Sequence, residues 1–327
     1  MKKVNVGVIG LGHNGNAFCE RYMKNEKSRL IAVCDLDNTR LETVMKKYNV
    51  KGFSNYDIFK EPGIDLISIH TPDHLHKEPF IKAIEHGYHV FVEKPMADTE
   101  EDLMKMVKAA ENNTGKVYAV GHILRFDAYF ELVKKWIDLG VLGDIFYVEC
   151  DYIHDLRYQY FMEEWKISKE IPVLGGGCHA IDLLRWFVDD IMEVSSFSNR
   201  TAYPEMKEDS SMVTMLKFKN GCLGKVTSLY GCRSPRPQAF NLSIYGTKGS
   251  IVRDKLSIDG LGEKWMDIPE IVDANHDYMP EIDHVLDCIL NNKPALVTPR
   301  EGLKTCIAGL YSVKSAKENR TIKLPEV

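Results

Sequence analysis

The stretch "VIGLGHNGNAF", residues 8–18, joins the end of an apolar run to a glycine-rich turn and the start of a helical pattern. Gly10, Gly12 and Gly15 have the spacing GxGxxG. Glycines at these positions permit a tight turn and let a pyrophosphate approach the exposed N–H groups at the start of the following helix. Glycine-rich turns also close strand–helix corners for steric reasons alone, so the surrounding sequence has to decide between the two interpretations.

The surrounding sequence favours a dinucleotide site. Asp35 follows the next apolar run, about 20 residues beyond the turn, where a carboxylate accepts hydrogen bonds from a ribose diol. Leu36 and Asp37 would be poor neighbours for a 2′-phosphate, which favours NAD over NADP. Arg40 lies nearby and could weaken this preference for NAD. We therefore expect NAD as the cofactor, with NADP disfavoured.

Outward from this motif, apolar runs alternate with helical patterns through residues 1–125. The runs are continuous rather than alternating in polarity, which is typical of strands covered on both faces. Strands are expected at 4–9, 30–34, 66–70, 89–92 and 117–120, and helices at 14–24, 38–48, 74–86 and 99–112. This order predicts an α/β domain with a doubly wound parallel sheet, a Rossmann fold.

Residues 126–327 show a different pattern, because several β-like runs follow one another without helices between them. Strands are expected at 145–148, 193–199, 211–218, 223–229, 240–245 and 250–253, and helices at 127–139, 179–187, 281–290 and 301–317. The pair Asn220-Gly221 between two of these runs is a strong hairpin signal. We expect a second domain of α+β type, with a largely antiparallel sheet backed by helices.

Composition narrows the functional class. The chain has 327 residues, of which 44% are hydrophobic, and a net charge of −5, so it can form two domains and carries no basic stripe for nucleic acid. Neither a signal peptide nor a run long enough for a membrane helix is evident. The eight cysteines are scattered without a CxxC pair. We expect a cytoplasmic protein without structural zinc.

The segment "HTPDHLHKE", residues 70–78, follows the third expected strand. Loops at the carboxyl ends of parallel strands line the ligand crevice, so Thr71 and Pro72 are expected beside the cofactor. His74 and His76 could alternatively form a metal pair. Residues two apart at a helix start do not share a face, however, and no third ligand is evident. We expect no metal site.

The segment "HVFVEKPMADTEEDL", residues 89–103, brings Glu93 and Lys94 to the end of another strand, at the edge that carries the glycine turn. A surface lysine paired with Glu93 is the simplest interpretation. At the crevice edge, however, a lysine can hydrogen-bond an alcohol oxygen while its proton leaves. The free lysine pKa of about 10.4 would have to fall for Lys94 to act as a base.

The segment "GGGCHAIDLLRW", residues 175–186, supplies a second candidate. His179 and Asp182 are three residues apart at a helix start and therefore share a face. A histidine titrates near neutrality and can shuttle a proton. Taken alone, a helix whose face packs on the sheet would explain the pattern equally well.

With GxGxxG, "TPDHLH", "EKPMA", "VGHILRF" and "GGGCHAIDLLRW" in this order, the chain resembles the glucose-fructose oxidoreductase / inositol 2-dehydrogenase / rhizopine catabolism (Gfo/Idh/MocA) family over essentially its whole length. The resemblance implies a Rossmann domain followed by a domain with a large open sheet that often mediates homo-dimers or homo-tetramers. It also implies activity on a hydroxyl-bearing carbon of a sugar, inositol or nucleotide sugar.

The resemblance further implies roles for individual residues. Lys94 matches the catalytic lysine of the EKP motif, and His179 matches the catalytic histidine. The residues that match cofactor-binding positions are Gly10, Gly12, His13, Asn14, Gly15, Asp35, Thr71, Pro72, His76, Glu93, Lys94 and Arg125.

A substrate pocket could be shaped by the aromatic segment "DYIHDLRYQYFMEEW", residues 151–165, because aromatic faces stack on the C–H surfaces of sugars. An interface or core loop would explain the segment equally well. The expected substrate-binding residues are Lys94, His154, Arg157, Trp165, His179 and Asp182, with Asp155 as a further hydroxyl ligand.

One position departs from the family pattern. The family commonly has an aspartate four residues before the catalytic histidine, where this chain has Gly175. Asp182 or a residue between Tyr152 and Trp165 would have to replace it. Without a carboxylate neighbour, His179 should titrate near its free value of about 6.5. We also expect the glycine to leave space beside the reacting carbon, so that glycosides are preferred over free myo-inositol.

The sequence therefore predicts an NAD-dependent dehydrogenase of a sugar, glycoside or cyclic polyol, with Lys94 and His179 handling the proton. One alternative is a glycoside-cleaving enzyme that uses tightly held NAD for transient oxidation and elimination. Another is a non-catalytic dinucleotide-binding sensor, which the intact EKP motif and His179 disfavour.

Overall fold

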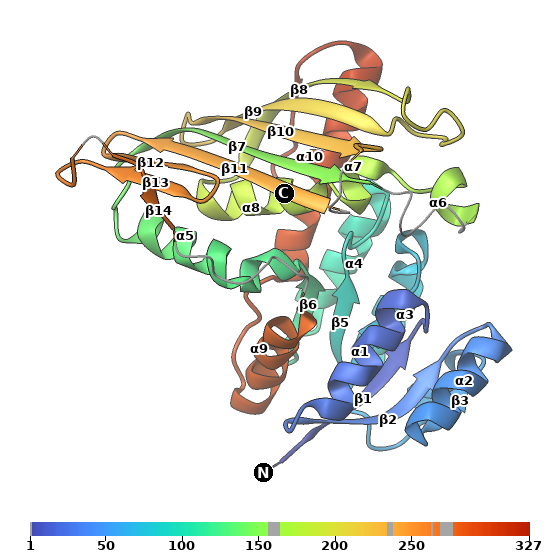
Figure 1. Cartoon of the computed structure of the whole chain (residues 1–327). Helices are drawn as coiled ribbons and strands as arrows, with labels where there is room; N and C mark the ends of the chain where they lie inside the picture. Colours follow the sequence, from blue (N-terminus) through green and yellow to red (C-terminus); the bar gives the residue numbers. More distant parts are fainter. Residues whose placement is uncertain (1, 156–163, 234–237, 263, 269–276) are drawn as a thin grey trace. The chain divides into compact units, whose positions relative to one another are not determined.

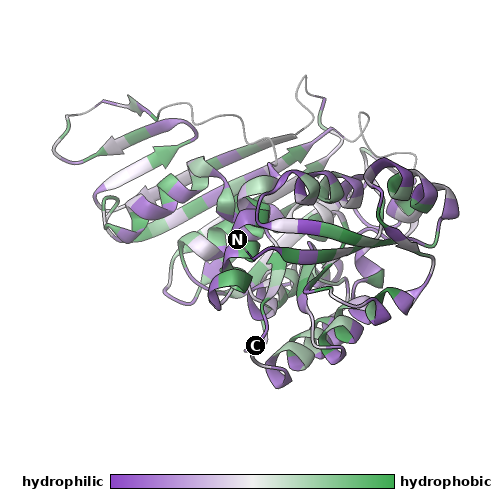
Figure 2. Ribbon diagram, turned by 90° about the horizontal axis from the view of Figure 1, so that it is seen from below, coloured by the Kyte–Doolittle hydropathy of each residue, from purple (hydrophilic) through white to green (hydrophobic). Residues whose placement is uncertain are grey.

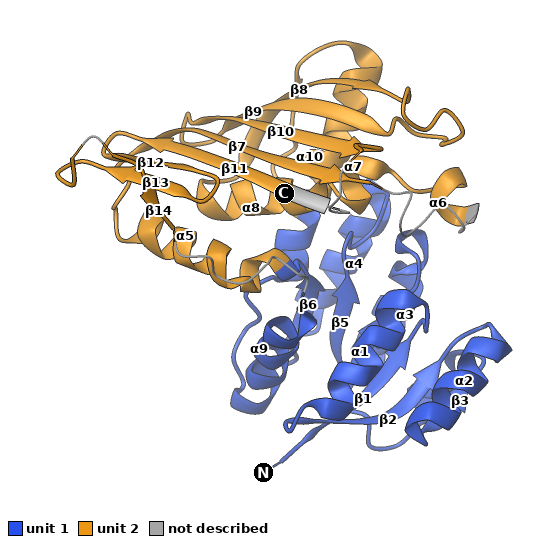
Figure 3. Cartoon of the chain, viewed as in Figure 1, with its two compact units in different colours: residues 1–123, 276–303 blue, residues 124–275, 304–327 orange. Residues whose placement is uncertain are grey.

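The chain is divided into two compact units, which are coloured separately in Figure 3. The computed structural model describes residues 2–155, 164–233, 238–262, 264–268 and 277–327 (Figure 1). Unit 1 consists of residues 1–123 together with 276–303, and unit 2 consists of 124–275 together with 304–327.

Unit 1 is built on a six-stranded sheet in the order β3-β2-β1-β4-β5-β6, and every neighbouring pair is parallel. The strands are β1 (Val4–Ile9), β2 (Ser28–Cys34), β3 (Lys51–Phe53), β4 (Leu66–Ile69), β5 (His89–Glu93) and β6 (Tyr118–Gly121). The predicted Rossmann sheet is confirmed. The strand order reverses between β1 and β4, and ligands of such sheets bind outside the carboxyl ends of the strands at this reversal.

Five helices in the described part of unit 1 surround this sheet: α1 (His13–Lys24), α2 (Asn38–Tyr48), α3 (Lys77–Glu85), α4 (Glu100–Asn112) and α9 (Tyr278–Asn291). Two of them begin with a side chain that caps the first turn. The Asp37 side chain accepts hydrogen bonds from the N–H groups of Thr39 and Arg40 at the start of α2. The Thr99 side chain accepts a hydrogen bond from the N–H group of Asp102 at the start of α4.

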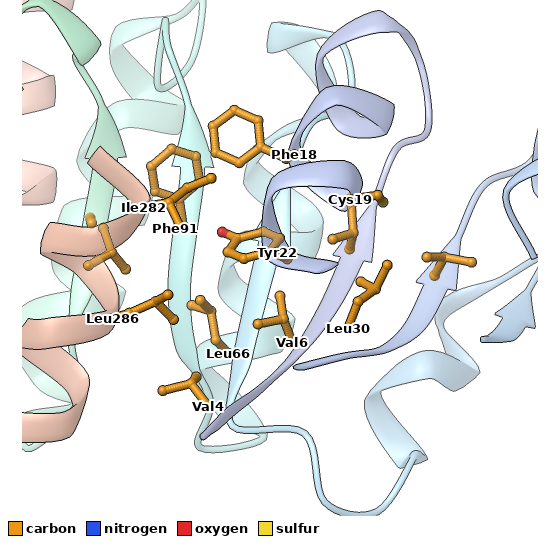
Figure 4. Close-up of a cluster of buried hydrophobic side chains, with 14 of the residues drawn as sticks. Val4, Val6, Phe18, Cys19, Tyr22, Leu30, Leu66, Phe91, Ile282 and Leu286 are labelled. Carbon is orange, nitrogen blue, oxygen red and sulfur yellow. The ribbon is translucent and has the colours of Figure 1, made fainter. Parts of the chain in front are cut away.

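Helix α9 comes late in the sequence but belongs to unit 1. Its apolar stripe, Ile282, Val285 and Leu286, is buried in the same cluster as Phe18 and Phe91. Figure 4 shows Ile282 and Leu286 of α9 next to the side chains that the sheet and α1 contribute to this cluster. The helix was predicted, but it was assigned to a second domain spanning 126–327. Residues 276–303 pack with the Rossmann sheet instead, because an apolar stripe does not specify which core it joins.

Unit 2 contains a nine-stranded sheet in the order β14-β13-β12-β11-β7-β10-β9-β8-β15, within the residues that the structure describes. The strands are β7 (Ile145–His154), β8 (Ile191–Asn199), β9 (Ser211–Phe218), β10 (Leu223–Tyr230), β11 (Gln238–Gly246), β12 (Gly249–Val252), β13 (Lys255–Ile258), β14 (Met266–Asp267) and β15 (Ile322–Lys323). Among the described strands of this sheet, the β7–β10 pair alone is parallel, so the predicted mostly antiparallel sheet is confirmed. Asn220 and Gly221 form the β9–β10 turn, as expected, with Gly221 at a φ of +90°.

One face of this sheet is buried, and the hydropathy alternates along its strands (Figure 2). The helices in the described part of unit 2 are α5 (Ala128–Asp138), α6 (Glu164–Ser168), α7 (Pro172–Gly175) and α8 (Cys178–Phe187), and α10 (Pro299–Glu318) contributes its later residues. Helix α8 packs on β7 and β10, the two central strands that carry Tyr152, His154, Ser228 and Tyr230 on their buried face. The fold therefore brings these side chains to the helix that begins near His179.

Within the described residues, no helix combines the length and the apolar character that crossing a bilayer would need.

Candidate active site

The glycine turn between β1 and α1 contains two glycines that the packing requires and one that it does not. A Cβ on Gly10, whose φ is +87°, would lie 2.6 Å from the peptide that joins His70 to Thr71, and one on Gly15 would lie 1.8 Å from the Gly10 carbonyl oxygen. A Cβ on Gly12 would meet no atom within 4 Å. The space over Gly12 is therefore open, where a pyrophosphate would have to approach the start of α1.

The carboxylate of Asp35 is fixed to the same turn. Asp35 is only 9% exposed, and its two oxygens accept the N–H groups of Leu11 at 2.7 Å and Asp37 at 2.8 Å. The half-exposed guanidinium of Arg40 lies 3.5 Å from Oδ1. The acid is thus held beside the glycines, with its remaining acceptor capacity available for a ribose diol.

The loop after β4 supplies a further polar group at this edge of the sheet. The Thr71 hydroxyl is buried and has no hydrogen-bond partner among the described residues. Buried hydroxyls are normally hydrogen-bonded, so an unpartnered one beside Gly10 is consistent with a bound group that completes it. Together with the open space over Gly12 and the position of Asp35, this residue set fits a dinucleotide.

His76 joins two loops of unit 1. Its Nε2 lies 2.7 Å from the Thr71 carbonyl oxygen, and its Nδ1 lies 3.0 Å from the Pro95 carbonyl oxygen. Burial lowers the pKa of His76, while Asp73 and the carbonyl groups oppose that shift. Because both ring nitrogens face carbonyl oxygens, His76 ties the loop after β4 to the loop after β5. Among the described residues, no group of three or more His, Cys, Asp or Glu side chains is arranged to hold a metal ion.

The end of β5 carries Glu93 and Lys94. Glu93 is buried and accepts the N–H group of Lys94 at 3.1 Å, and the Lys94–Pro95 peptide is cis. Burial raises the pKa of Glu93 to about 7, although the charge of Lys94 opposes the shift. Glu93 is therefore not a surface partner of the lysine, and the simple surface ion pair does not describe this site.

A buried polar chain runs from Glu93 into the core of unit 1. His70 Nδ1 lies 3.9 Å from the Glu93 carboxylate, and His70 Nε2 lies 2.7 Å from the Ser68 hydroxyl. The Ser68 hydroxyl in turn lies 3.0 Å from the Tyr22 hydroxyl. Burial lowers the pKa of His70 to about 3, so the imidazole stays neutral and does not offset a charge on Glu93.

His179 begins α8 in unit 2 and is 2% exposed. The Tyr152 ring stacks on it at a centroid distance of 5.9 Å, and the Phe240 ring meets it edge-on at 6.0 Å. The Tyr152 hydroxyl lies 2.8 Å from His154 Nδ1. The structure thus brings together His154 and His179, two of the residues that the sequence suggests for substrate binding.

The sequence places Asp182 on the same helix face as His179, but in the structure its carboxylate binds Arg125. Its two carboxylate oxygens each accept a hydrogen bond from the Arg125 guanidinium at 2.8 Å, and the Thr305 hydroxyl donates at 3.0 Å. All three residues are buried. This bidentate pair neutralises both charges and favours a structural role for Asp182 and for Arg125 within unit 2.

The structure contradicts one expectation at Gly175. A Cβ at this position would lie 2.0 Å from Glu170 Oε1, 2.9 Å from the Glu170 carboxyl carbon and 3.0 Å from the Tyr230 hydroxyl. The volume beside Gly175 is therefore filled, and the expectation that the glycine leaves space for a larger substrate is wrong. Glu170 was not identified from the sequence, because it belongs to no motif and lies outside the 152–165 segment in which a replacement was sought.

The remaining candidates lie at the margins of these clusters. His13 is exposed at the start of α1, and the Asn14 side chain accepts a hydrogen bond from Tyr278 at 3.4 Å. Trp165 is half-buried in α6, with the Lys166 ammonium over its ring at 5.3 Å. Arg157 lies outside the described residues.

Comparison with known proteins agrees with this architecture. Residues 4–122 match the profile described as "Oxidoreductase family, NAD-binding Rossmann fold", and residues 134–324 match the one described as "Oxidoreductase family, C-terminal alpha/beta domain".

Similar individual proteins span several activities. A scyllo-inositol 2-dehydrogenase (NAD(+)) of Bacillus subtilis is 25% identical over 342 residues, covering 98% of this chain and 96% of that protein. A 2,7-anhydro-N-acetylneuraminate hydratase of Escherichia coli is 29% identical over 262 residues, covering 77% and 68%. A solved levoglucosan dehydrogenase in complex with NADH and L-sorbose has the same fold, with a TM-score of 0.91 at 23% identity over 100% of both chains.

Alanine substitutions at Gly12 and at Gly15 should have different effects, because the space around the two glycines differs. Gly12→Ala should keep the wild-type melting temperature, because its Cβ meets open space. The added methyl group should obstruct the pyrophosphate and reduce the free energy of NAD binding by about 1–3 kcal/mol, which weakens NAD affinity about 10–100-fold. Gly15→Ala should lower the melting temperature, because its Cβ would clash with the Gly10 carbonyl. Thermal unfolding and NAD titration of both variants measure this. Unchanged NAD affinity in Gly12→Ala would place the cofactor elsewhere.

The buried Glu93 predicts a pH-dependent stability. Its pKa in the folded protein, about 7, exceeds its ordinary value of 4.5, so the unfolded chain ionises first and wild-type stability falls as the pH rises between these values. Glu93→Gln removes this loss, on the order of 3 kcal/mol. The free energy of unfolding of the variant minus that of wild type should therefore be larger at pH 8 than at pH 5.

Urea unfolding at both pH values tests this prediction, with the exposed Glu42→Gln on α2 as the control. An equal stability difference between Glu93→Gln and wild type at the two pH values would show that Glu93 does not titrate in this range.

Proposed function

The chain belongs to the Gfo/Idh/MocA oxidoreductase family, and we propose that it transfers a hydride between NAD and a hydroxyl-bearing carbon of a sugar, glycoside or cyclic polyol. The observation that carries the proposal is the position of Lys94 directly after β5, at the carboxyl edge of the sheet that also presents the glycine turn and Asp35. Inositol and levoglucosan dehydrogenases among the similar proteins support this substrate class.

The roles of the residues follow from their chemistry. The N–H groups at the start of α1 bind the pyrophosphate, and Asp35 accepts the ribose hydroxyls. NAD, when bound, supplies the hydride acceptor. Lys94 donates a hydrogen bond to the substrate oxygen on which negative charge develops, and His179 takes the hydroxyl proton during oxidation. Lys94 belongs to unit 1 and His179 to unit 2.

A second function is supported by the hydratases among the similar proteins. In this alternative a hydroxyl-bearing carbon would be oxidised transiently to a carbonyl, and loss of the proton α to that carbonyl would break the carbon–oxygen bond at the β position. Bound NAD would supply a reversible hydride acceptor for the oxidation and the final reduction. The protein would then retain its cofactor and form no net NADH. Product analysis by mass distinguishes this reaction from simple dehydrogenation.

Self-association through unit 2 is part of the proposal. Four apolar residues are exposed on the strands β8, β9 and β10: Phe197, Val213, Met215 and Leu223. Phe197 and Val213 are cross-strand neighbours, and they alternate with the buried positions of their strands, so the group faces away from the core. We propose that a second copy of the chain covers this face and forms a homo-dimer or homo-tetramer.

Sedimentation of the wild type tests the assembly. Phe197→Lys together with Met215→Lys should shift it toward the monomer, while Met104→Lys on the exposed side of α4 should not. A wild type that sediments as a monomer at micromolar concentration excludes the assembly.

The catalytic proposal is tested by screening inositols, aldoses, glycosides and sugar acids for NADH formation and for new product masses. Lys94→Ala and His179→Ala should each lower turnover about 10²–10⁴-fold and leave NAD affinity nearly unchanged, with effects that are less than additive if both serve one proton path. The exposed Lys105→Ala is the matched control. Near-normal turnover in either variant removes that residue from the mechanism.

A further inference from the structure

We propose that Glu93 is a redox-linked proton site: its carboxyl group takes a proton from solvent when NADH is bound and returns it when NAD+ is bound. His70 is the positioning residue of this site, because it acts through Glu93. The inference rests on the proposed function, since it concerns the cofactor that the hydride transfer uses.

The place of Glu93 in the sheet brings its charge to the proposed reaction. Glu93 ends β5 and directly precedes Lys94, at the carboxyl edge of the parallel sheet. The proposed function puts the substrate oxygen at Lys94, and hydride transfer needs the nicotinamide within about 3–3.5 Å of the reacting carbon. The ring whose positive charge is lost on reduction therefore lies at the same edge as the Glu93 carboxylate.

The Glu93 carboxylate is enclosed by its own sheet. Glu93 is 6% exposed, and its Oε2 accepts the N–H group of Lys94 at 3.1 Å. A Cβ on Gly121 of the neighbouring strand β6 would lie 3.4 Å from Oε2 and 3.0 Å from the Phe91 ring. A carboxylate with so little solvent is sensitive to a nearby charge, because charges interact more strongly in the protein interior than in water.

His70 faces the other oxygen of this carboxylate. Its Nδ1 lies 3.9 Å from Glu93 Oε1, which is longer than a hydrogen bond, and has no hydrogen-bond partner among the described residues. The Phe18 ring lies 4.2 Å from the imidazole and the Phe91 ring lies 5.8 Å from it, between ring centroids. The imidazole is therefore packed between apolar rings, with this nitrogen on the side of Glu93.

The hydrogen bonds behind His70 suit both protonation states of Glu93. His70 Nε2 lies 2.7 Å from the Ser68 hydroxyl, which lies 3.0 Å from the Tyr22 hydroxyl. A neutral imidazole carries its proton on either nitrogen, and a hydroxyl can donate or accept. With the proton on Nδ1, His70 presents an N–H group to an ionised Glu93, and Ser68 donates to Nε2. With the proton on Nε2, His70 presents a lone pair to a protonated Glu93, and Ser68 accepts.

Other ionisable groups lie around this pair. On the described parts of the surrounding elements they are Tyr22 of α1, His76 before α3, Lys94 after β5, His122 after β6 and Glu281 of α9. Burial raises the pKa of Tyr22 and lowers the pKa values of His70 and His76, so these three groups are neutral at pH 7. Burial raises the pKa of Glu93 to about 7, although the Lys94 charge opposes the shift.

Cofactor binding across pH tests this linkage without turnover. The dissociation constants of NAD+ and NADH are measured between about pH 5.5 and about pH 8.5, a range that spans the Glu93 pKa. The readout is the ratio of the two constants, because pyrophosphate and adenosine are common to both forms and groups that face them cancel. Calorimetry in two buffers with different ionisation enthalpies counts the protons exchanged.

The variants separate the groups that could bind this proton. Glu93→Gln removes the proposed site, and His122→Gln and Glu281→Gln remove other ionisable groups near it. His70→Leu removes the imidazole, whereas His70→Asn keeps an amide near the position of Nδ1. Thermal unfolding reports whether each variant is folded, and the exposed His86→Leu is the matched control.

In the wild type, the dissociation constant of NADH divided by that of NAD+ should rise about 10-fold from low to high pH. An ionised Glu93 favours the positively charged ring, and a pKa difference of about one unit between the two complexes changes the ratio about tenfold. Roughly half a proton should be taken up at pH 7 when NADH replaces NAD+. Glu93→Gln should abolish both effects.

The two His70 variants should differ from each other. His70→Leu should move the rise to higher pH by about one unit, because the ionised carboxylate loses the N–H dipole that faces it. His70→Asn should restore the wild-type midpoint, because its amide can donate to or accept from Glu93. A wild-type midpoint in His70→Leu would overturn the positioning role of His70.

Failure of this inference is distinguishable from failure of the proposed function. A wild type that binds neither NAD+ nor NADH contradicts the proposed function itself. A wild type that binds both forms with a ratio independent of pH overturns only the proton site. A pH dependence that survives in Glu93→Gln, or disappears in His122→Gln or Glu281→Gln, assigns the proton elsewhere and also overturns it. If Glu93→Gln binds neither form, the difference between His70→Leu and His70→Asn decides.

Discussion

The close approach of Gly10 to the peptide between His70 and Thr71 is the constraint on which the rest of unit 1 depends. A Cβ at this position would lie 2.6 Å from that peptide, so only glycine lets the carboxyl ends of β1 and β4 meet in this way. Gly15 then packs on the Gly10 carbonyl and starts α1 beside the sheet, which places Phe18 in the core. The same turn leaves open space over Gly12 and fixes Asp35 beside it. The same stretch of backbone therefore requires glycine for close packing and forms the predicted cofactor site.

Three buried acids meet the cost of burial in different ways, and the differences separate structure from chemistry. Asp182 is neutralised by a bidentate arginine, which suits a fixed element of the fold. Glu93 has no such partner in its buried chain, and burial raises its pKa to about 7. Glu170 accepts a hydrogen bond from the Tyr230 hydroxyl, in a cluster that also contains two histidines. The pKa of Glu93 therefore lies near neutrality, and Glu93 directly precedes Lys94, which the proposed reaction uses.

Secondary structure was predictable wherever one physical signal dominated. The long apolar strands of unit 1 and the Asn220-Gly221 hairpin appear as their sequences indicate. Short edge strands such as β3, β14 and β15 were missed, because two or three residues give no period and their pairing depends on a neighbour distant in the sequence. Helix α9 was found but assigned to the other domain, since its stripe indicates burial and not the partner that buries it.

The sequence by itself determined the fold class, the glycine turn, the acid after β2 and the lysine after β5, because local spacing and strand order suffice to place them at one edge of a parallel sheet. Only the tertiary structure decided what stands beside Gly175. The chain before Pro172 brings the Glu170 side chain back against Gly175, so the volume beside the glycine is filled by a residue that precedes it in the sequence. No sequence pattern predicts which side chain fills a volume, because that depends on three-dimensional packing and not on spacing along the chain.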